Sequence, residues 1–136
     1  MTPKNFLLIG GIVLILVAIL AFMGVIGPTA ADSIFGDSWW FDNGENWAHL
    51  IIGIVGLIGA FAFPMPLQRT VVYVLAVIGV LIGIYSIFSE GFLGANLENP
   101  ADSILHIVIG VWAFLSARGG GSMMSSGSGM GTQMPS

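Results

Sequence analysis

Four long apolar runs, separated by loops that hold nearly every charge, constrain this chain more than any other feature. The runs cover about residues 6–27, 46–63, 70–88 and 101–117 of the 136-residue sequence. A helix that crosses a bilayer needs about 20 apolar residues, with a range of about 17 to 25. Within lipid, a lone segment satisfies its own backbone hydrogen bonds only as a helix. The sequence therefore predicts an all-α membrane protein with four transmembrane helices.

The composition supports the same class of protein. Only 7% of the residues are charged, whereas a soluble domain carries roughly a quarter. The chain has no cysteine, which excludes disulfides and thiolate metal sites. It also contains no phosphate-binding loop, no plausibly spaced Ser–His–Asp set and no basic nucleic-acid patch. We therefore expect neither an enzyme nor a nucleic-acid partner, and the lipid bilayer is the first partner.

The basic residues predict the orientation. Lys4, Arg69 and Arg118 are the only lysines and arginines, and four crossings would place all three on one side. Such residues beside membrane helices mark the cytoplasmic face. We expect a multi-pass protein of the cell membrane with both termini cytoplasmic. The acids fall in the other two loops: Asp32, Asp37, Asp42, Glu45, Glu90, Glu98 and Asp102.

The first apolar run has an alternative interpretation as a signal peptide. The stretch "GPTAADS" is a passable cleavage region for a signal peptide. However, the run is longer than the roughly 7 to 15 apolar residues of a signal sequence. We therefore expect it to remain as a membrane helix.

The two histidines occupy the same local frame, acid-x-x-x-His-x-x-x-Gly, and lie 57 positions apart. The frame comprises Glu45, His49 and Gly53 in one copy and Asp102, His106 and Gly110 in the other. Two hairpins of the same orientation, related by a pseudo-twofold axis along the membrane normal, would explain this spacing. The sequence thus predicts two parallel-repeat hairpins.

Each frame begins with residues that favour a helix start. Asp42 is expected to cap the second helix, with Glu45 at its third position. Asn99 is expected to cap the fourth helix, with Pro100 first and Asp102 third. Each histidine then lies on the same helix face as its acid, about one turn inside the membrane.

The residues His49, His106, Glu45 and Asp102 form the candidate site. We expect a structural polar pair, in which each histidine bonds its acid or a group across the bundle. Two alternatives use the same side chains: a divalent metal bound by two carboxylates and two imidazoles, or a haem or related tetrapyrrole between the histidines. No metal or cofactor is favoured, because the acids already serve as helix starts and haem propionates would lack nearby basic residues.

Several small residues predict close helix packing. The candidates are Gly53, Gly56 and Gly59 in the second run, Gly79 and Gly83 in the third, and Gly110 in the fourth. Small residues let membrane helices approach closely, within one chain or between chains. We therefore expect a small structural or accessory membrane protein that packs with itself, as a homo-oligomer, or with a larger membrane complex.

Two further regions are a tryptophan-containing loop and a low-complexity C-terminal tail. The loop before the second helix carries Trp39 and Trp40, and Trp47 follows them; all three suit an aromatic belt at the outer interface. We expect a membrane domain over residues 1–118 and a flexible Gly/Ser/Met-rich tail over 119–136.

The stretches "NPADSILHIVIG" and "WAHLIIGIVG", together with the four-helix plan, resemble the domain-of-unknown-function 4383 family of bacterial membrane proteins. The resemblance covers roughly residues 5–117. It implies the four-helix fold and the membrane location. The family has no established activity, so the resemblance implies no catalytic residue.

Overall fold

The computed structural model describes residues 1–119 of the chain. Its elements, in order, are α1 (Pro3–Phe22), the 3-10 helix η1 (Gly36–Ser38), α2 (Asn43–Ala62), α3 (Met65–Ser86), β1 (Gly91–Phe92), β2 (Ala95–Asn96) and α4 (Ala101–Gly119). Each of the four α-helices is long and apolar enough to cross a membrane. The four predicted membrane-length helices are therefore confirmed. The predicted tail, apart from Gly119, lies outside the described residues.

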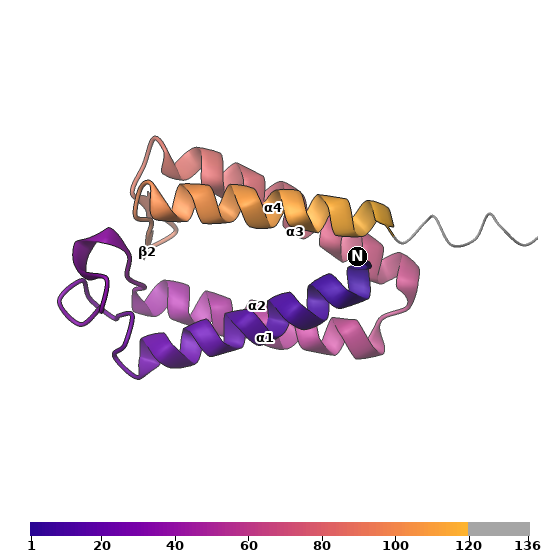
Figure 1. Ribbon diagram of the computed structural model, residues 1–136, viewed down its shortest axis with the longest axis horizontal. Coiled ribbons are helices and arrows are strands. Elements are labelled where there is room, and N and C mark those ends of the chain that lie inside the picture. The colour runs from indigo at the N-terminus through magenta and orange to yellow at the C-terminus, as the bar shows by residue number, and fades with distance from the viewer. Residues whose placement is uncertain (120–136) are drawn as a thin grey trace, which may run out of the picture.

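The helices associate in two antiparallel pairs (Figure 1). The first helix packs along α2, and α3 packs along α4. Most helix contacts between the pairs come from α1, which touches both α3 and α4. Each helix therefore buries one face mainly against the other helix of its pair.

The first helix ends before the apolar run does. The run continues to residue 27, but α1 ends at Phe22. Gly24 has φ of 75°, and the Val25 N–H donates to the Leu20 carbonyl at 2.9 Å while the Gly24 N–H donates to Ala21 at 3.1 Å. These bonds form a Schellman motif, which stops a helix at a left-handed glycine. The helix therefore covers Pro3–Phe22, whereas the expected membrane span is about 6–27; Thr2 is the side-chain cap at its start.

One glutamine holds the turn between α2 and α3. The Gln68 side chain is buried, and its amide nitrogen lies 3.0 to 3.2 Å from the carbonyl oxygens of Gly59, Ala60 and Phe63. The last carbonyls of a helix have no partner within it. Gln68 supplies that partner, which fixes the end of α2 against the start of α3.

The loop before α4 contains a short β-hairpin that the all-α expectation missed. β1 and β2 pair antiparallel, with Phe92 opposite Ala95. The two residues between them, Leu93 and Gly94, both have positive φ, as the tight two-residue turns of hairpins require. The sequence "FLGAN" offers only Gly94 as a signal for such a turn.

Two apolar cores stabilise the bundle. The larger joins all four helices and contains Phe6, Leu7, Ala60, Val72, Ala76, Ala113 and Ala117. The Phe6 ring meets Trp112 edge to face, with ring centroids 4.6 Å apart. The smaller core packs the loop after α1 onto the helix ends through Ala21, Ile26 and Phe41. Small alanines dominate the larger core, so the helices there lie close together.

The same positions are buried in both helix pairs. Every buried residue of α3 falls 65 positions after a buried residue of α1, as Gly11 and Ala76 illustrate. The buried residues of α2 and α4 match one for one at an offset of 57, the spacing of His49 and His106. Between α1 and α3, the matches in order are Pro3, Leu7, Gly11, Ala18 and Ala21 with Gln68, Val72, Ala76, Gly83 and Ser86. Between α2 and α4, they are Glu45, Asn46, Gly53, Gly56, Gly59 and Ala60 with Asp102, Ser103, Gly110, Ala113, Ser116 and Ala117.

Candidate functional site at the acidic end

The acidic end of the bundle, formed by loops 23–42 and 87–100 with the starts of α2 and α4, carries the candidate site. At the start of α2, the Glu45 N–H donates to the Asp42 carboxylate at 2.9 Å, and the Asp42 N–H donates to the Glu45 carboxylate at 3.3 Å. This reciprocal pair is a capping box. The predicted start of the second helix is confirmed.

The start of α4 differs from the prediction. The helix begins at Ala101, after Pro100. Asn99 does not cap a backbone N–H; its side-chain oxygen accepts the Ser103 hydroxyl at 3.3 Å. The Asp102 carboxylate instead accepts the Glu98 N–H at 2.7 Å. The expected Asn99 cap is therefore wrong, because Asp102 reaches back and orders the loop itself.

Two hydrogen bonds tie the first half of the chain to the second at this end. The Trp39 indole N–H donates to the Asp102 carboxylate at 3.2 Å, and the Asn96 N–H donates to the Asp42 carboxylate at 2.6 Å. Trp39 also packs edge to face on Phe41, with centroids 5.0 Å apart. The Trp39 indole is therefore half-buried among the loops of this end. Trp47, by contrast, is exposed.

Three carboxylates are buried here. Glu45 is 4% exposed, Glu98 8% and Asp102 1%. Such groups are rarely buried without compensation. Burial, followed by the negative charge of Asp102, raises the pKa of Glu98 from 4.5 to about 7. One Glu98 oxygen accepts from the Asn96 side chain, and the other has no hydrogen-bond partner among the described residues.

The raised pKa of Glu98 predicts a pH-dependent stability. The folded state holds the Glu98 proton more tightly than the unfolded state, so this contribution is greatest at low pH. It is lost as pH rises from 4.5 to about 7. We expect the melting temperature in detergent to fall across this window, and the Glu98→Gln variant to show a smaller fall. Thermal unfolding at several pH values measures the difference.

Glu90 provides the control for this experiment, because its side chain is exposed on the same loop. The Glu90→Gln variant should keep the pH profile of the parent chain. Parallel profiles for the parent and Glu98→Gln would contradict the prediction.

The two histidines have different surroundings, although their sequence frames match. The His106 Nδ1 lies 2.8 Å from the main-chain carbonyl of Asp102 on its own helix. The His49 ring meets Phe41 edge to face, with centroids 5.1 Å apart, and its buried Nδ1 has no partner among the described residues. His106 thus contacts the acid residue of its frame through the backbone rather than through the carboxylate.

A metal site would require several acid and histidine side chains of this end to converge on one point. Within residues 1–119, no three His, Asp or Glu side chains gather in a geometry that could hold a metal ion. The carboxylates of Asp42 and Asp102 each accept two hydrogen bonds from nearby loops or helix starts. These acids therefore accept hydrogen bonds from backbone and indole N–H groups.

Five of the six candidate packing glycines lie closest to the other helix of their pair. A Cβ on Gly53 would lie 2.9 Å from the Gly11 carbonyl oxygen of α1, and one on Gly110 would lie 2.9 Å from the Ala76 carbonyl oxygen of α3. Gly56 likewise faces Leu7, and Gly79 and Gly83 face α4, whereas a Cβ on Gly59 would first meet the Phe63 ring at 3.0 Å. These glycines therefore serve close approach within the chain.

Sequence reasoning missed several polar residues of this end. Ser86 and Ser103 share a hydrogen bond of 2.7 Å between α3 and α4. Asn46 is fully buried, and neither polar atom of its side chain has a partner among the described residues. The available signal was a polar residue directly after the acid in each frame, which gives Asn46 and Ser103.

Comparison with known proteins adds no relative. No protein-family model, curated protein or solved structure matches this chain.

Proposed function

We propose that this chain is a small integral membrane protein with a structural or accessory role, which packs with a larger membrane complex or with itself. The observation that carries the proposal is the apolar outer surface of all four helices. One side chain from each illustrates it: Leu16, Ile51, Leu81 and Val108 are 55%, 56%, 59% and 57% exposed. Contiguous apolar surface of this extent marks contact with lipid or protein.

The acidic end supports a structural role for the candidate site. Asp42, Glu45 and Asp102 accept hydrogen bonds that cap α2 and hold the loops. A group that already satisfies backbone N–H donors stabilises the fold through those bonds. The resemblance to the domain-of-unknown-function 4383 family remains part of the proposal, and it transfers no catalytic residue.

We further propose that the chain consists of two copies of one helical hairpin. The matching buried positions of the two pairs support this relation, including the glycines Gly53 and Gly110 at the closest approaches. Both copies place an acid, a histidine and a glycine on successive turns of the second helix. A parallel repeat gives the two hairpins the same orientation in the membrane.

The proposed orientation puts both termini in the cytoplasm, because Lys4, Arg69 and Arg118 lie at the opposite end from the acids. The chain lacks cysteine, so single cysteines can be introduced at Ser38 and Ser122. We expect an impermeant maleimide to label Ser38→Cys on intact cells and Ser122→Cys only after permeabilisation. Labelling of Ser122→Cys on intact cells would reverse the topology, and the cysteine-free chain is the control.

The proposed association is tested by site-specific photo-crosslinking in membranes. A photoreactive residue is placed in turn at Leu16, Ile51, Leu81 and Val108, which are similarly exposed on the four helices. A structural or accessory role predicts a discrete protein adduct from at least one face, identified by mass spectrometry as a second copy or another membrane protein. Lipid adducts alone at all four positions would contradict it.

A further inference from the structure

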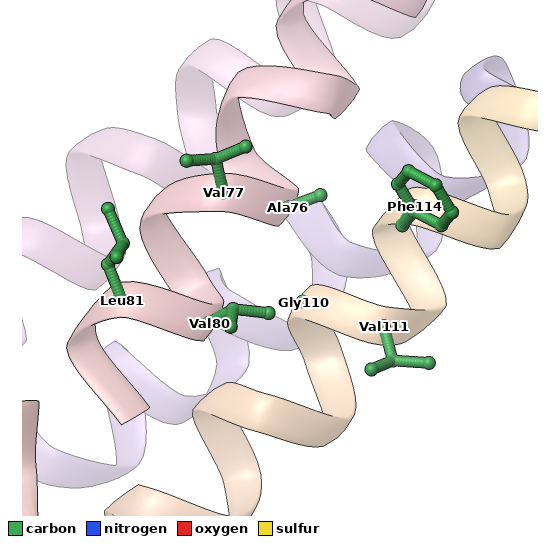
Figure 2. Close-up of a pocket in the computed structure, with 7 residues that line it drawn as sticks. All are labelled: Ala76, Val77, Val80, Leu81, Gly110, Val111 and Phe114. Atoms are coloured by element: carbon green, nitrogen blue, oxygen red, sulfur yellow. The ribbon is translucent and has the colours of Figure 1, made fainter. Parts of the chain in front are cut away.

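An apolar groove runs along the outside of the α3–α4 pair (Figure 2). Its volume is about 300 Å³. Every lining side chain is apolar: Ala76, Val77, Val80 and Leu81 from α3, and Gly110, Val111 and Phe114 from α4. The volume is at the low end for pockets that hold small ligands, which span about 300 to 1,000 Å³.

The groove forms because one pair of helices lacks a covering side chain. In the α1–α2 pair, Leu57 covers Gly11, since a Cβ at Gly11 would lie 3.1 Å from the Leu57 side chain. At the offset of 57 positions that relates α2 to α4, the counterpart of Leu57 is Phe114. Its ring instead meets Tyr73 edge to face, with centroids 5.8 Å apart, and stands at the edge of the groove.

Two positive side chains lie at the end of the same helix pair. The Arg118 guanidinium carbon is 5.6 Å from the centre of the Phe114 ring. Arg69 donates to the Ala117 carbonyl at 2.9 Å and to the Arg118 carbonyl at 3.4 Å. All acids of the chain lie in the loops and helix starts of the other end. The apolar groove therefore lies next to the positively charged end of the pair, with Phe114 between the groove and Arg118.

We propose that the α3–α4 groove and its two arginines bind an anionic phospholipid, with one acyl chain along the groove and the phosphate at Arg118 and Arg69. The inference rests on the membrane placement given under Proposed function. Guanidinium groups bind phosphate through paired charge-assisted hydrogen bonds, and anionic lipids concentrate in the cytoplasmic leaflet.

The dimensions and the charge favour a lipid chain over a protein helix. A helix with its side chains is about 10 to 12 Å wide, so even two turns of it occupy more than the groove's volume of about 300 Å³. The apolar lining offers no hydrogen-bonding group to a protein side chain, and an acyl chain requires none. The adjacent arginines match the negative phosphate that such a chain carries.

The test is native mass spectrometry of the full chain in neutral detergent, titrated with phosphatidylglycerol or with phosphatidylcholine of the same acyl chains. We expect phosphatidylglycerol adducts and much weaker phosphatidylcholine adducts. Arg118→Gln should weaken phosphatidylglycerol binding by about tenfold or more, the effect of losing a charge-assisted hydrogen bond. Val111→Trp should weaken it similarly, because the larger ring occupies the groove.

Matched controls come from the other helix pair. Lys4 lies over the Phe61 ring at the same 5.6 Å, so Lys4→Gln removes an equivalent charge away from the groove. Ile54 is the counterpart of Val111 and is similarly exposed, so Ile54→Trp adds the same ring elsewhere. Both controls should bind phosphatidylglycerol as the parent chain does.

Three results would overturn the lipid site: equal binding of the two lipids, equal losses in Lys4→Gln and Arg118→Gln, or stable dimers in place of lipid adducts. Membrane fractionation of the parent chain separates the two proposals. A chain found in the membrane that binds no phosphatidylglycerol rejects only the lipid site. A chain absent from the membrane rejects the proposed function as well.

Discussion

Replacing Gly110 with valine is expected to lower the free energy of unfolding by about 3 kcal/mol, the upper part of the range for overpacked positions. A Cβ at Gly110 would lie 2.7 Å from the Val80 side chain and 2.9 Å from both the Ala76 carbonyl oxygen and the Val80 nitrogen. Two of these three atoms belong to the α3 backbone, so α4 must move away. Equilibrium unfolding in mixed detergent micelles measures the loss.

Gly10 provides the matched control for this change. It is also a helical glycine, but a Cβ there would meet nothing within 4 Å. Gly10→Val therefore makes the same chemical change without a collision, and its stability should stay close to that of the parent chain. Equal losses at Gly10 and Gly110 would show that valine itself, rather than helix contact, causes the effect.

Replacing Asp102 with alanine is expected to cost about 2 to 3 kcal/mol of stability. The change leaves the Trp39 indole N–H and the Glu98 N–H without their acceptor, and hydrogen bonds to charged groups contribute about 1.5 to 3 kcal/mol each. Part of the loss is offset, because the charge of Asp102 no longer repels Glu98. Chemical unfolding of the variant in detergent checks the value.

A double-mutant cycle with Trp39→Phe assigns the loss to the bond between the halves of the chain. Trp39 and Asp102 should couple by about 1 to 3 kcal/mol. Asp37, an exposed acid of the same loop, is the control, and Asp37→Ala should change stability little. Additive effects of Trp39→Phe and Asp102→Ala would mean that their hydrogen bond contributes nothing.

The features that the sequence predicted well are those determined by neighbouring residues. Long apolar runs specify helices because the backbone must bond within the segment, and Asp42 with Glu45 specifies a helix start across three positions. The end of α1 could also have been found, since Gly24 is a recognisable stop within the apolar run. Hydrophobicity outweighed that signal in the prediction.

The features that the sequence could not predict depend on distant pairs. The bond from Trp39 to Asp102 spans 63 positions, and the one from Asn96 to Asp42 spans 54. The unequal surroundings of His49 and His106 arise in the same way, because Phe41 comes from the longer first loop. The start of α4 is an exception, because Asp102 binds the Glu98 N–H only four positions before it, and the residue types around Asn99 do not distinguish this bond from the expected cap.

The packing of each helix mainly against its neighbour in sequence has a consequence for how the chain matures during synthesis. Once α2 has left the ribosome, α1 and α2 can already pack along each other, before α3 exists, and this pairing supplies most of their helix contacts. The second pair can form in the same manner, and short-range contacts of this kind assemble quickly. We expect the slower event to be the meeting of the two finished pairs, which brings the Phe6 ring to Trp112 and forms the hydrogen bond from Trp39 to Asp102. Misassembly would therefore start at this late step, with each pair already intact but not yet joined.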